Sequence, residues 1–477
     1  MAKTRSIGYS TTVNIVSGIV VLLTNVSISF FLSPYIIQTI GVEANGFVNL
    51  ANNFVTYAGL VVTALNAMAA RFITVAYIKK DYKTANLYYN SVFWGNLVIV
   101  ATFLIPAIIL VLRLESFVDV PVDLLADVKI LFVMVLLIFF INTGAPNWDC
   151  GTYITNRMDR SNFSSAIIAV LKCVILFCMF SILTPHVWYV GFASTLTGII
   201  YLMVQRYNTH TLTPKLKISL KKPICSLRAV KNLVGSGIWN AIANGGNTLM
   251  SGLDLLVSNK FLGATQMGVL SVSKSLPNIL ITFSETIRGA FGPELTITYA
   301  SGNKEEVFNS MRKSIKISTV IVTIPTAGII VMSGDLYRLW IPSQNAELLQ
   351  ILTILAILRY VFCSGITNLN TVFVTVNKVK CNSIALVITG IVSLGITFGL
   401  IAFTDWDIYA VAGVSSIVMI IKDVCFMAPM ATYFLGYKWY KFYPSLGISC
   451  LCCSVIILVG TIVRWINPVD SWLKFFF

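Results

Sequence analysis

Apolar stretches of about 20 residues recur from one end of the chain to the other, separated by short polar segments. A helix of about 20 residues is long enough to cross a hydrocarbon core of about 30 Å. So many stretches of this kind cannot all pack inside one soluble core. The pattern predicts about thirteen membrane-spanning helices, near residues 12–34, 47–75, 88–112, 127–148, 163–184, 187–206, 234–259, 266–293, 315–334, 348–376, 383–403, 408–434 and 445–463.

The composition agrees with this pattern. The chain has 477 residues, of which 57% are hydrophobic and 11% are charged. In soluble domains about 25% of residues are charged. Most of this chain therefore does not face water, and we expect an all-α polytopic membrane protein.

The formal net charge of +15 is informative mainly through the positions of the charged residues along the chain. Lys and Arg gather in the N-terminal segment and in every second loop, whereas the intervening loops are short or acidic. Cytoplasmic loops of membrane proteins carry such an excess of basic residues. We therefore expect a cytoplasmic N-terminus, and we interpret the basic charge as topological, with no nucleic-acid partner.

A repeated pattern divides the chain into two halves. IGVEANGF at 40–47 reappears as LGATQMGV at 262–269, so Gly41 corresponds to Gly263 at an offset of 222 residues (263 − 41). Six spans in each half predict two six-helix bundles related by a pseudo-two-fold axis along the membrane normal, with the working cavity between them. The expected parts are an N-terminal lobe at 1–206, a cytoplasmic linker at 207–233, a C-terminal lobe at 234–444, and an additional C-terminal span with its tail at 445–477.

Polar side chains recur at helical spacing in the first two spans of each half, which places them on one face of each helix. Such residues also hydrogen-bond between packed membrane helices, and this alternative stays open for any single position. Because the stripes follow nearly whole spans, we expect them to line an aqueous cavity. The expected lining consists of Asn25, Asn52, Asn66, Asn240, Asn244, Asn247 and Asn278.

Ionisable residues inside the spans are stronger signals of function. Each costs at least about 2.5–3.5 kcal/mol at the centre of a helix unless it is paired or hydrated. Arg71 lies near the end of its span and could equally anchor the helix at the interface. The expected cations of the cavity are Arg71, Lys172, Lys274, Arg288 and Arg359. The expected sites of coupling to H⁺ or Na⁺ are Asp254 and Glu285.

Local pairing separates these charges into two groups. Glu285 and Arg288 are three residues apart on one helix face and can neutralise each other. The sequence offers no equally obvious partner for Lys172, Lys274 or Arg359. With Arg71 left aside, the cations exceed the carboxylates by about two charges, which suits an anionic substrate such as a phosphate or diphosphate.

Two further charges, Lys422 and Asp423, are adjacent in the sequence. We expect them to pair or to lie near the inner interface, and we leave them out of the site.

The repeat makes the charge asymmetric between the halves. Lys274 stands where Asn52 stands in the first half (274 − 52 = 222), and Arg288 stands where Asn66 stands. We therefore expect the C-terminal lobe to hold most of the anion.

Signatures of enzymes are missing from the sequence. It contains no G-x-x-x-x-G-K-[ST] loop and no G-x-S-x-G or H-E-x-x-H motif. Its two histidines, His186 and His210, are too few for a metal site. We expect a transporter without enzymatic activity or cofactor, driven by an ion gradient, the membrane potential or the gradient of its substrate.

The segment FFLSPYIIQTIGVEANGFVNL at 30–50, followed by ALNAMAARFITVAY at 64–77 and the basic loop KKDYKTAN, resembles the Wzx-like polysaccharide flippases of the multidrug/oligosaccharidyl-lipid/polysaccharide (MOP) exporter superfamily. The second half matches in LGATQMGVLSVSKSLPNI and FGPELTITYASGNKEE. The resemblance implies a MATE-like fold with two six-helix bundles around a cavity, in the cytoplasmic membrane of a bacterium. It also implies alternating access that carries undecaprenyl-diphosphate-linked oligosaccharide from the cytoplasmic to the outer leaflet. Glycan polymerases and glycosyltransferases are the partners that such a role implies.

A lipid-linked oligosaccharide flippase is therefore the leading hypothesis. A multidrug exporter of the same fold is the first alternative, although cationic drugs favour a cavity dominated by carboxylates. A non-transporting membrane scaffold for glycan assembly is the second alternative.

Overall fold

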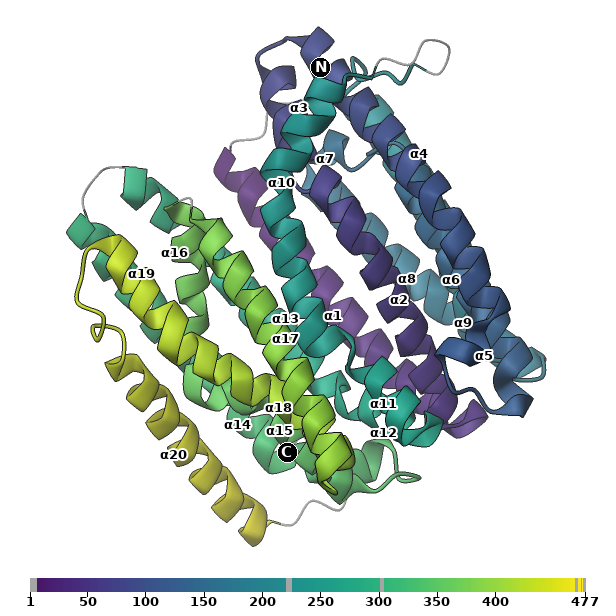
Figure 1. Ribbon diagram of the computed structural model, residues 1–477, viewed down its shortest axis with the longest axis vertical. Coiled ribbons are helices and arrows are strands. Elements are labelled where there is room, and N and C mark those ends of the chain that lie inside the picture. Colours follow the sequence, from purple (N-terminus) through teal and green to yellow (C-terminus); the bar gives the residue numbers. More distant parts are fainter. Residues whose placement is uncertain are drawn as a thin grey trace. The chain divides into compact units, whose positions relative to one another are not determined.

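The computed structural model describes residues 7–219, 225–300, 304–376, 378–467, 471–472 and 474, and every regular element in this part of the chain is a helix. The chain forms two compact units, Met1–Ala241 (unit 1) and Ile242–Phe477 (unit 2), and passes from one to the other inside α10 (Leu227–Asn247) (Figure 1). Residues 220–224 of the expected linker and most of the expected tail lie outside the described residues. The all-α prediction is confirmed.

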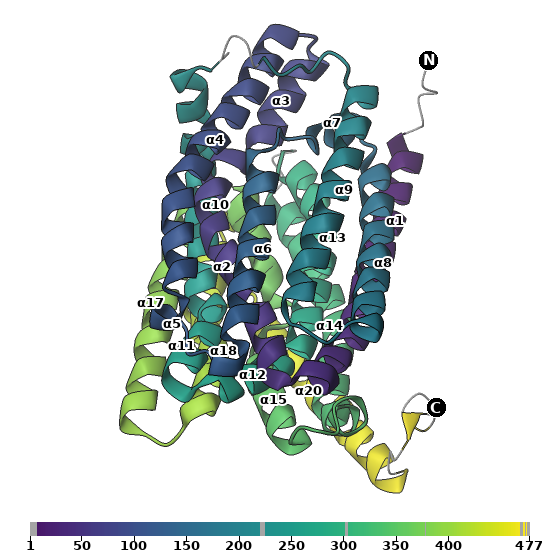
Figure 2. The same ribbon diagram turned by 90° about the vertical axis from the view of Figure 1, so that its right-hand side faces the viewer.

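Unit 1 consists mainly of long helices that run roughly parallel to one another (Figure 2). Within it, α6 packs against α9, α1 against α8, and α3 against α4. Besides the first part of α10, its helices are α1 (Ile7–Ile40), α2 (Val42–Asn66), α3 (Ala69–Ile78), α4 (Tyr82–Leu112), α5 (Leu114–Phe117), η1 (Val122–Leu124), α6 (Leu125–Gly144), α7 (Cys150–Ile154), α8 (Met158–Ile182) and α9 (Trp188–Leu212).

The segment after α9 is held against α4 by two asparagines one helical turn apart. Asn86 donates a hydrogen bond from Nδ2 to the Lys215 carbonyl (3.0 Å), and its Oδ1 accepts one from the Lys217 amide (2.7 Å). Asn90 does the same with the Lys217 carbonyl (2.9 Å) and the Ser219 amide (2.8 Å). The side-chain amides thus satisfy backbone groups of an extended segment that has no neighbouring strand. This part of the expected linker is fixed to unit 1.

Unit 2 contains more interrupted helices than unit 1. Two π-helical turns interrupt it, η2 after α10 and η4 after α18. Its elements are η2 (Thr248–Gly252), α11 (Asp254–Leu262), α12 (Ala264–Ser273), α13 (Ser275–Ala300), α14 (Lys304–Trp340), α15 (Ala346–Cys363), η3 (Ile366–Leu369), α16 (Asn370–Thr375), α17 (Val379–Phe403), α18 (Asp407–Lys422), η4 (Asp423–Met427), α19 (Ala428–Leu435) and α20 (Pro444–Ile466).

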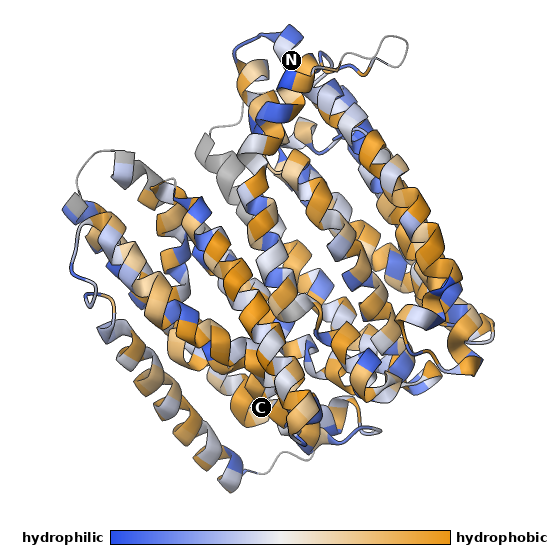
Figure 3. Cartoon of the chain, viewed as in Figure 1, coloured by the Kyte–Doolittle hydropathy of each residue, from blue (hydrophilic) through white to orange (hydrophobic). Residues whose placement is uncertain are grey.

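A helix occupies each of the thirteen predicted spans, and ten helices in the described part of the chain are long and apolar enough to cross a membrane. The three that fall short are those at 187–206, 234–259 and 266–293. Those at 234–259 and 266–293 are the first two spans of the second half, which carry the polar stripes described above. The chain is a multi-pass membrane protein. Its helix α4 is largely hydrophobic in sequence (Figure 3), and apolar side chains such as Val98, Ile105 and Leu112 are exposed on it.

The repeat predicted from the two glycine motifs has a structural counterpart in each unit. Gly41 is the single residue between α1 and α2, with φ 113° and ψ 165°. Gly263 is the single residue between α11 and α12, with φ 90° and ψ 171°. This backbone region is accessible essentially only to glycine. The same one-residue turn therefore joins the corresponding helices in both halves.

The expected additional C-terminal span is α20, which packs against α14 and α15. Arg464 forms an ion pair with Asp335 of α14 through two contacts, Nη2–Oδ1 at 2.8 Å and Nε–Oδ2 at 2.5 Å. Ser449 lies near the start of α20, at the opposite end from Arg464. Its hydroxyl is 2.6 Å from the hydroxyl of Ser364. The opposite face of α20 is apolar and exposed, as for a helix that faces lipid, and includes Leu451, Val455, Leu458, Ile462 and Val463.

The backbone conformation of the glycine turn can be tested by substitution. Gly263→Ala should destabilise the folded protein by about 1–3 kcal/mol, because a Cβ is strained in that backbone region. The control is Gly395→Ala in α17, where an added Cβ meets no atom within 4 Å and the backbone is helical. Thermal unfolding in detergent measures both. Equal midpoints for the two variants would contradict the assignment.

Candidate functional site

The structure exposes most of the asparagines that we expected to line a cavity. In unit 1, the side chains of Asn25, Asn52 and Asn240 are exposed, and in unit 2 those of Asn244, Asn247 and Asn278 are exposed. An exposed amide in a membrane-length helix needs water or a polar partner, because hydrocarbon offers no hydrogen bonds. These six positions are therefore available to a polar substrate or to water.

Asn66 behaves differently from the other six. It is half-buried, donates from Nδ2 to Oδ1 of Asn96 in α4 (2.9 Å), and accepts from Nδ2 of Asn96 (3.3 Å). The two amides satisfy each other between α2 and α4. At this position the alternative holds that polar side chains hydrogen-bond between packed helices. The amide groups of Asn66 that a ligand would need are bonded to Asn96.

The polar stripe of α13 is exposed along at least two helical turns. Asn278, Thr282, Glu285 and Thr286 all have exposed side chains. The hydroxyl of Thr282 donates to the Asn278 carbonyl (2.8 Å), and that of Thr286 donates to the Thr282 carbonyl (2.8 Å). The side chain of Glu285 is 58% exposed. This face of α13 requires a hydrated surrounding.

Lys274, for which the sequence offered no obvious local partner, pairs with Asp254. The Nζ–Oδ2 distance is 2.5 Å, with Asp254 buried and Lys274 half-buried. Asp254 is the first residue of α11, separated from η2 by Leu253 alone, and Lys274 is the single residue between α12 and α13. Each charge thus lies at a break in a helix, where the chain can bring the two together.

Proline explains the break beside Lys274. Pro277 has no N–H to donate to the carbonyl four residues earlier, that of Ser273. Thr353 of α15 donates its hydroxyl to this carbonyl (3.0 Å), and the Tyr337 hydroxyl of α14 lies 3.4 Å from it. The two hydroxyls are also 2.8 Å apart. A buried polar cluster from two other helices therefore replaces the lost backbone hydrogen bond.

Arg359 also has a partner, contrary to expectation. Its Nε lies 2.7 Å from Oδ2 of Asp423, and Nζ of Lys422 lies 3.0 Å from Oδ1 of the same carboxylate. The exposed fractions of the side chains are 16% for Arg359, 0% for Asp423 and 6% for Lys422. One buried carboxylate therefore joins two cations, at the junction of α18 and η4.

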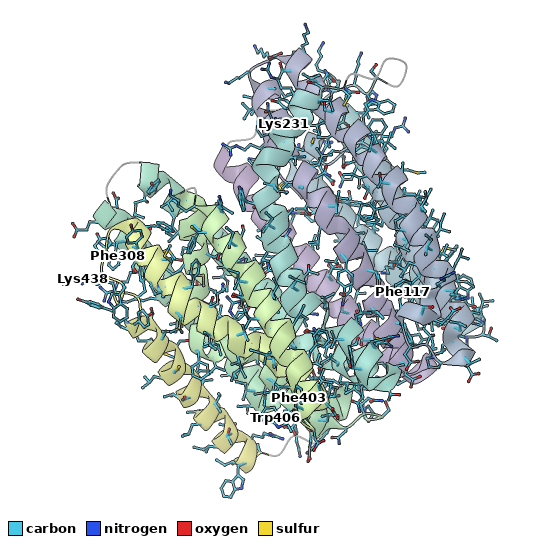
Figure 4. The ribbon with its side chains drawn as sticks, viewed as in Figure 1. Phe117, Lys231, Phe308, Phe403, Trp406 and Lys438 are labelled. Carbon is cyan, nitrogen blue, oxygen red and sulfur yellow. The ribbon has the colours of Figure 1, made fainter. Side chains whose placement is uncertain are left out.

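The expected pairing of Lys422 with Asp423 is confirmed, but their site lies deep in the helical run. Lys422 follows the start of α18 by 15 residues, about 22 Å at 1.5 Å per residue. Phe403 and Trp406 mark one end of this run and Lys438 the other (Figure 4). The position of Lys422 in the sequence could have shown this depth. We left Lys422 and Asp423 out of the site, but the contacts of Asp423 with Arg359 and Lys422 place them in it.

The expected neutralisation of Glu285 by Arg288 is confirmed, with Nη2 of the arginine 3.4 Å from Oε1. Tyr360 of α15 lies close enough to this pair and to Arg359 and Asp423 to interact electrostatically with all four. It thereby connects the exposed face of α13 with the buried charges of α15 and η4.

Two expected cations remain without a carboxylate partner among the described residues, and both are in unit 1. Lys172 is half-buried and lies 14 residues after the start of α8, about 21 Å along the helix. Arg71 is exposed on α3. The three expected cations of unit 2, Lys274, Arg288 and Arg359, are each paired with a carboxylate. The expectation that the C-terminal lobe holds most of the anion stays a prediction.

Metal-binding clusters are not found in the described residues, where no three or more His, Cys, Asp or Glu side chains gather. The described part of the site contains amides, hydroxyls and ion pairs. Such groups can bind and release a polar or charged ligand.

The Asp254–Lys274 pair generates a thermodynamic prediction. Asp254→Asn alone should destabilise the protein by about 3–5 kcal/mol, because it leaves a cation without a partner at a largely buried position. Asp254→Asn combined with Lys274→Met removes both charges and should restore part of that loss. Thermal unfolding of the two single variants and the double variant measures the coupling. Strictly additive losses would show that the pair is energetically irrelevant.

No protein-family model matches the chain. An uncharacterized membrane protein of Bacillus subtilis (strain 168), EpsK, is 24% identical over 463 residues, which cover 97% of this chain and 91% of EpsK. The inward-facing conformation of a multidrug resistance MATE family transporter of the MOP superfamily superimposes with a TM-score of 0.69 at 14% identity, covering 87% of this chain and 98% of the other. An outward-facing conformation of such a transporter gives a TM-score of 0.62 at 13% identity, covering 94% and 96%. The expected fold is confirmed: the chain is similar in fold to the MATE transporters of the MOP superfamily.

Proposed function

We propose that this protein is a transporter that flips undecaprenyl-diphosphate-linked oligosaccharide repeat units from the cytoplasmic to the outer leaflet by alternating access. The observation that carries the proposal is the exposure of polar side chains on helices of a multi-pass membrane protein, which also has two cations, Lys172 and Arg71, without a carboxylate partner among its described residues. The similarity in fold to transporters in inward-facing and outward-facing conformations supports the mode of transport.

The diphosphate is the part of the substrate that needs cations. Lys172 and Arg71 are the best candidates, because the described residues give neither of them a carboxylate to displace. Arginine offers two parallel hydrogen bonds to phosphate oxygens, and lysine offers a point charge. In unit 2, Lys274, Arg288 and Arg359 can contact phosphate only by sharing or exchanging their present carboxylate partners.

The sugars need hydrogen bonds and the lipid tail needs none. The exposed amides of Asn25, Asn52, Asn244 and Asn278 can each donate and accept hydrogen bonds with sugar hydroxyls. The apolar outer faces of helices such as α20 match a tail that remains in the bilayer. The proposed location is the bacterial cytoplasmic membrane with a cytoplasmic N-terminus, and glycan polymerases or glycosyltransferases are the proposed partners.

A multidrug exporter is the alternative suggested by the similarity in fold, since the superimposed transporters are described as multidrug resistance proteins. A cationic drug requires an available carboxylate. Asp254 and Asp423 are each engaged by a cation at 2.5 Å and 2.7 Å, and Glu285 shares its exposed face with Arg288. The charge balance therefore favours an anionic substrate.

Neutralising Lys172 tests the proposal and separates it from a scaffold role. Lys172→Gln should slow flipping at least about tenfold, because the loss of a hydrogen bond to a charged group costs about 1.5–3 kcal/mol and 1.4 kcal/mol is a factor of ten. In cells that depend on the protein, lipid-linked oligosaccharide should then accumulate on the cytoplasmic leaflet at normal abundance of the transporter. Arg359 and Lys274 are less suitable for this test, because their neutralisation also breaks a buried ion pair.

The matched control is Lys83→Gln, which removes the same charge from an exposed lysine at the start of α4. It should leave export unchanged. Normal export by Lys172→Gln, at normal abundance, contradicts the role of this lysine, and normal export after neutralisation of both Lys172 and Arg71 favours a scaffold.

A further inference from the structure

The cluster of Arg359, Lys422 and Asp423 holds one positive charge more than its carboxylate neutralises. Asp423 receives Arg359 at 2.7 Å on one oxygen and Lys422 at 3.0 Å on the other. Asp423 is fully buried and Lys422 keeps only 6% of its side chain exposed. An uncompensated charge in such a place is costly, because burial removes the hydration of the charge.

We propose that Lys422 is the proton-exchanging group that couples transport to a proton gradient. The inference rests on the proposed transport function and names the coupling ion and its site. Lys422 releases one proton and takes one up in each transport cycle.

Lysine is the member of the cluster that can perform this exchange. The guanidinium of Arg359 stays protonated in proteins. Asp423 is held by two cations, which favour its charged form. When the N–H bond of the Lys422 ammonium breaks, the proton passes to water as hydronium and the neutral amine keeps the electron pair. The cluster that remains is a neutral Arg359–Asp423 pair, and uptake of a proton on the opposite side of the membrane restores the ammonium.

A proton is also the ligand that fits the available space. Asp423 presents no exposed surface and Lys422 almost none, so neither a phosphate nor a hydrated metal cation has access to them. A metal cation would in addition meet the two positive charges of Arg359 and Lys422. Exchange of a proton changes the charge without requiring a cavity.

The neighbourhood of Lys422 offers few competing ionisable groups. Those that act on it are Asp423 in η4 and Arg359 and Cys363 in α15. The adjacent η3 and α19 carry no Asp, Glu, Lys, Arg or His. Asp254, on the neighbouring α11, is neutralised one-to-one by Lys274, so that pair gains nothing from losing a proton.

Tyr360 provides a connection from this cluster to the exposed face of α13. It lies close enough to interact with Arg359 and Asp423 on one side and with Glu285 and Arg288 on the other. Glu285 is 58% exposed on the face that we propose to contact the substrate. A change of charge at Lys422 acts directly on Arg359 and Asp423, the two members of the cluster that also interact with Tyr360.

The first test detects the proton itself and needs no substrate. Protein labelled with ¹⁵N-lysine in bilayers should show one ζ-nitrogen that changes between ammonium and amine between about pH 5 and about pH 9, a range in which ordinary lysines, with a pKa near 10.4, stay protonated. Lys422→Arg should lack that signal. An ammonium at Lys422 throughout this range overturns the inference, whether or not the protein is a flippase.

The second test measures coupling in proteoliposomes with a fluorescent polyprenyl-diphosphate oligosaccharide. At steady state, the ratio of probe between the leaflets should change about tenfold per unit of pH gradient in the wild type and in Lys83→Gln, as one proton per cycle requires. In Lys422→Arg, which keeps the charge but cannot release the proton, the ratio should not respond. A ratio that follows a Na⁺ gradient, or a Lys422→Arg variant that responds like the wild type, overturns the inference. A wild type that moves no probe refutes the proposed function, and the NMR measurement then decides on proton exchange separately.

Discussion

A charge inside a membrane-spanning helix must be paired or hydrated, and the interior of unit 2 is organised by this constraint. Three buried carboxylates in its described part join different segments of the chain. Asp254 binds Lys274 between α11 and the α12–α13 break, Asp423 binds Arg359 of α15, and Asp335 binds Arg464 of α20. These ion pairs fix which helices are neighbours, a task that apolar contacts alone perform weakly where lipid is as apolar as the side chains.

The same constraint identifies the parts that are free to act. Lys172 and Arg71 have no carboxylate partner in the described chain, and the polar face of α13 is exposed. Groups that the fold has not neutralised are the ones available to a charged, hydroxyl-rich substrate. The buried cluster at Lys422 is intermediate, since it is paired and yet carries one charge in excess. The proposed binding and the proposed energy coupling therefore fall on different residues.

Much of the fold could be predicted because it depends on local patterns. Apolar stretches of sufficient length predicted the helices. Gly41 and Gly263 predicted the repeat, and the structure shows both glycines in the same backbone region, which few other residues tolerate. The pairing of Glu285 with Arg288 followed from their spacing on one helix. Exposure of the asparagine stripes followed from their periodicity, with Asn66 as the exception.

The ion pairs across helices could not be predicted in this way. Asp254 and Lys274 are 20 residues apart and Arg359 and Asp423 are 64 apart, so only tertiary packing brings them together. Neither the periodicity of a single helix nor a count of charges contains that information, so the count could not show which cations already have a carboxylate partner. Direct measurement of flipping tests the account. Purified protein in proteoliposomes should expose a fluorescent polyprenyl-diphosphate oligosaccharide from the inner leaflet to a membrane-impermeant quencher, faster than protein-free vesicles do. Equal rates with and without the protein, under every ion gradient applied, would contradict it.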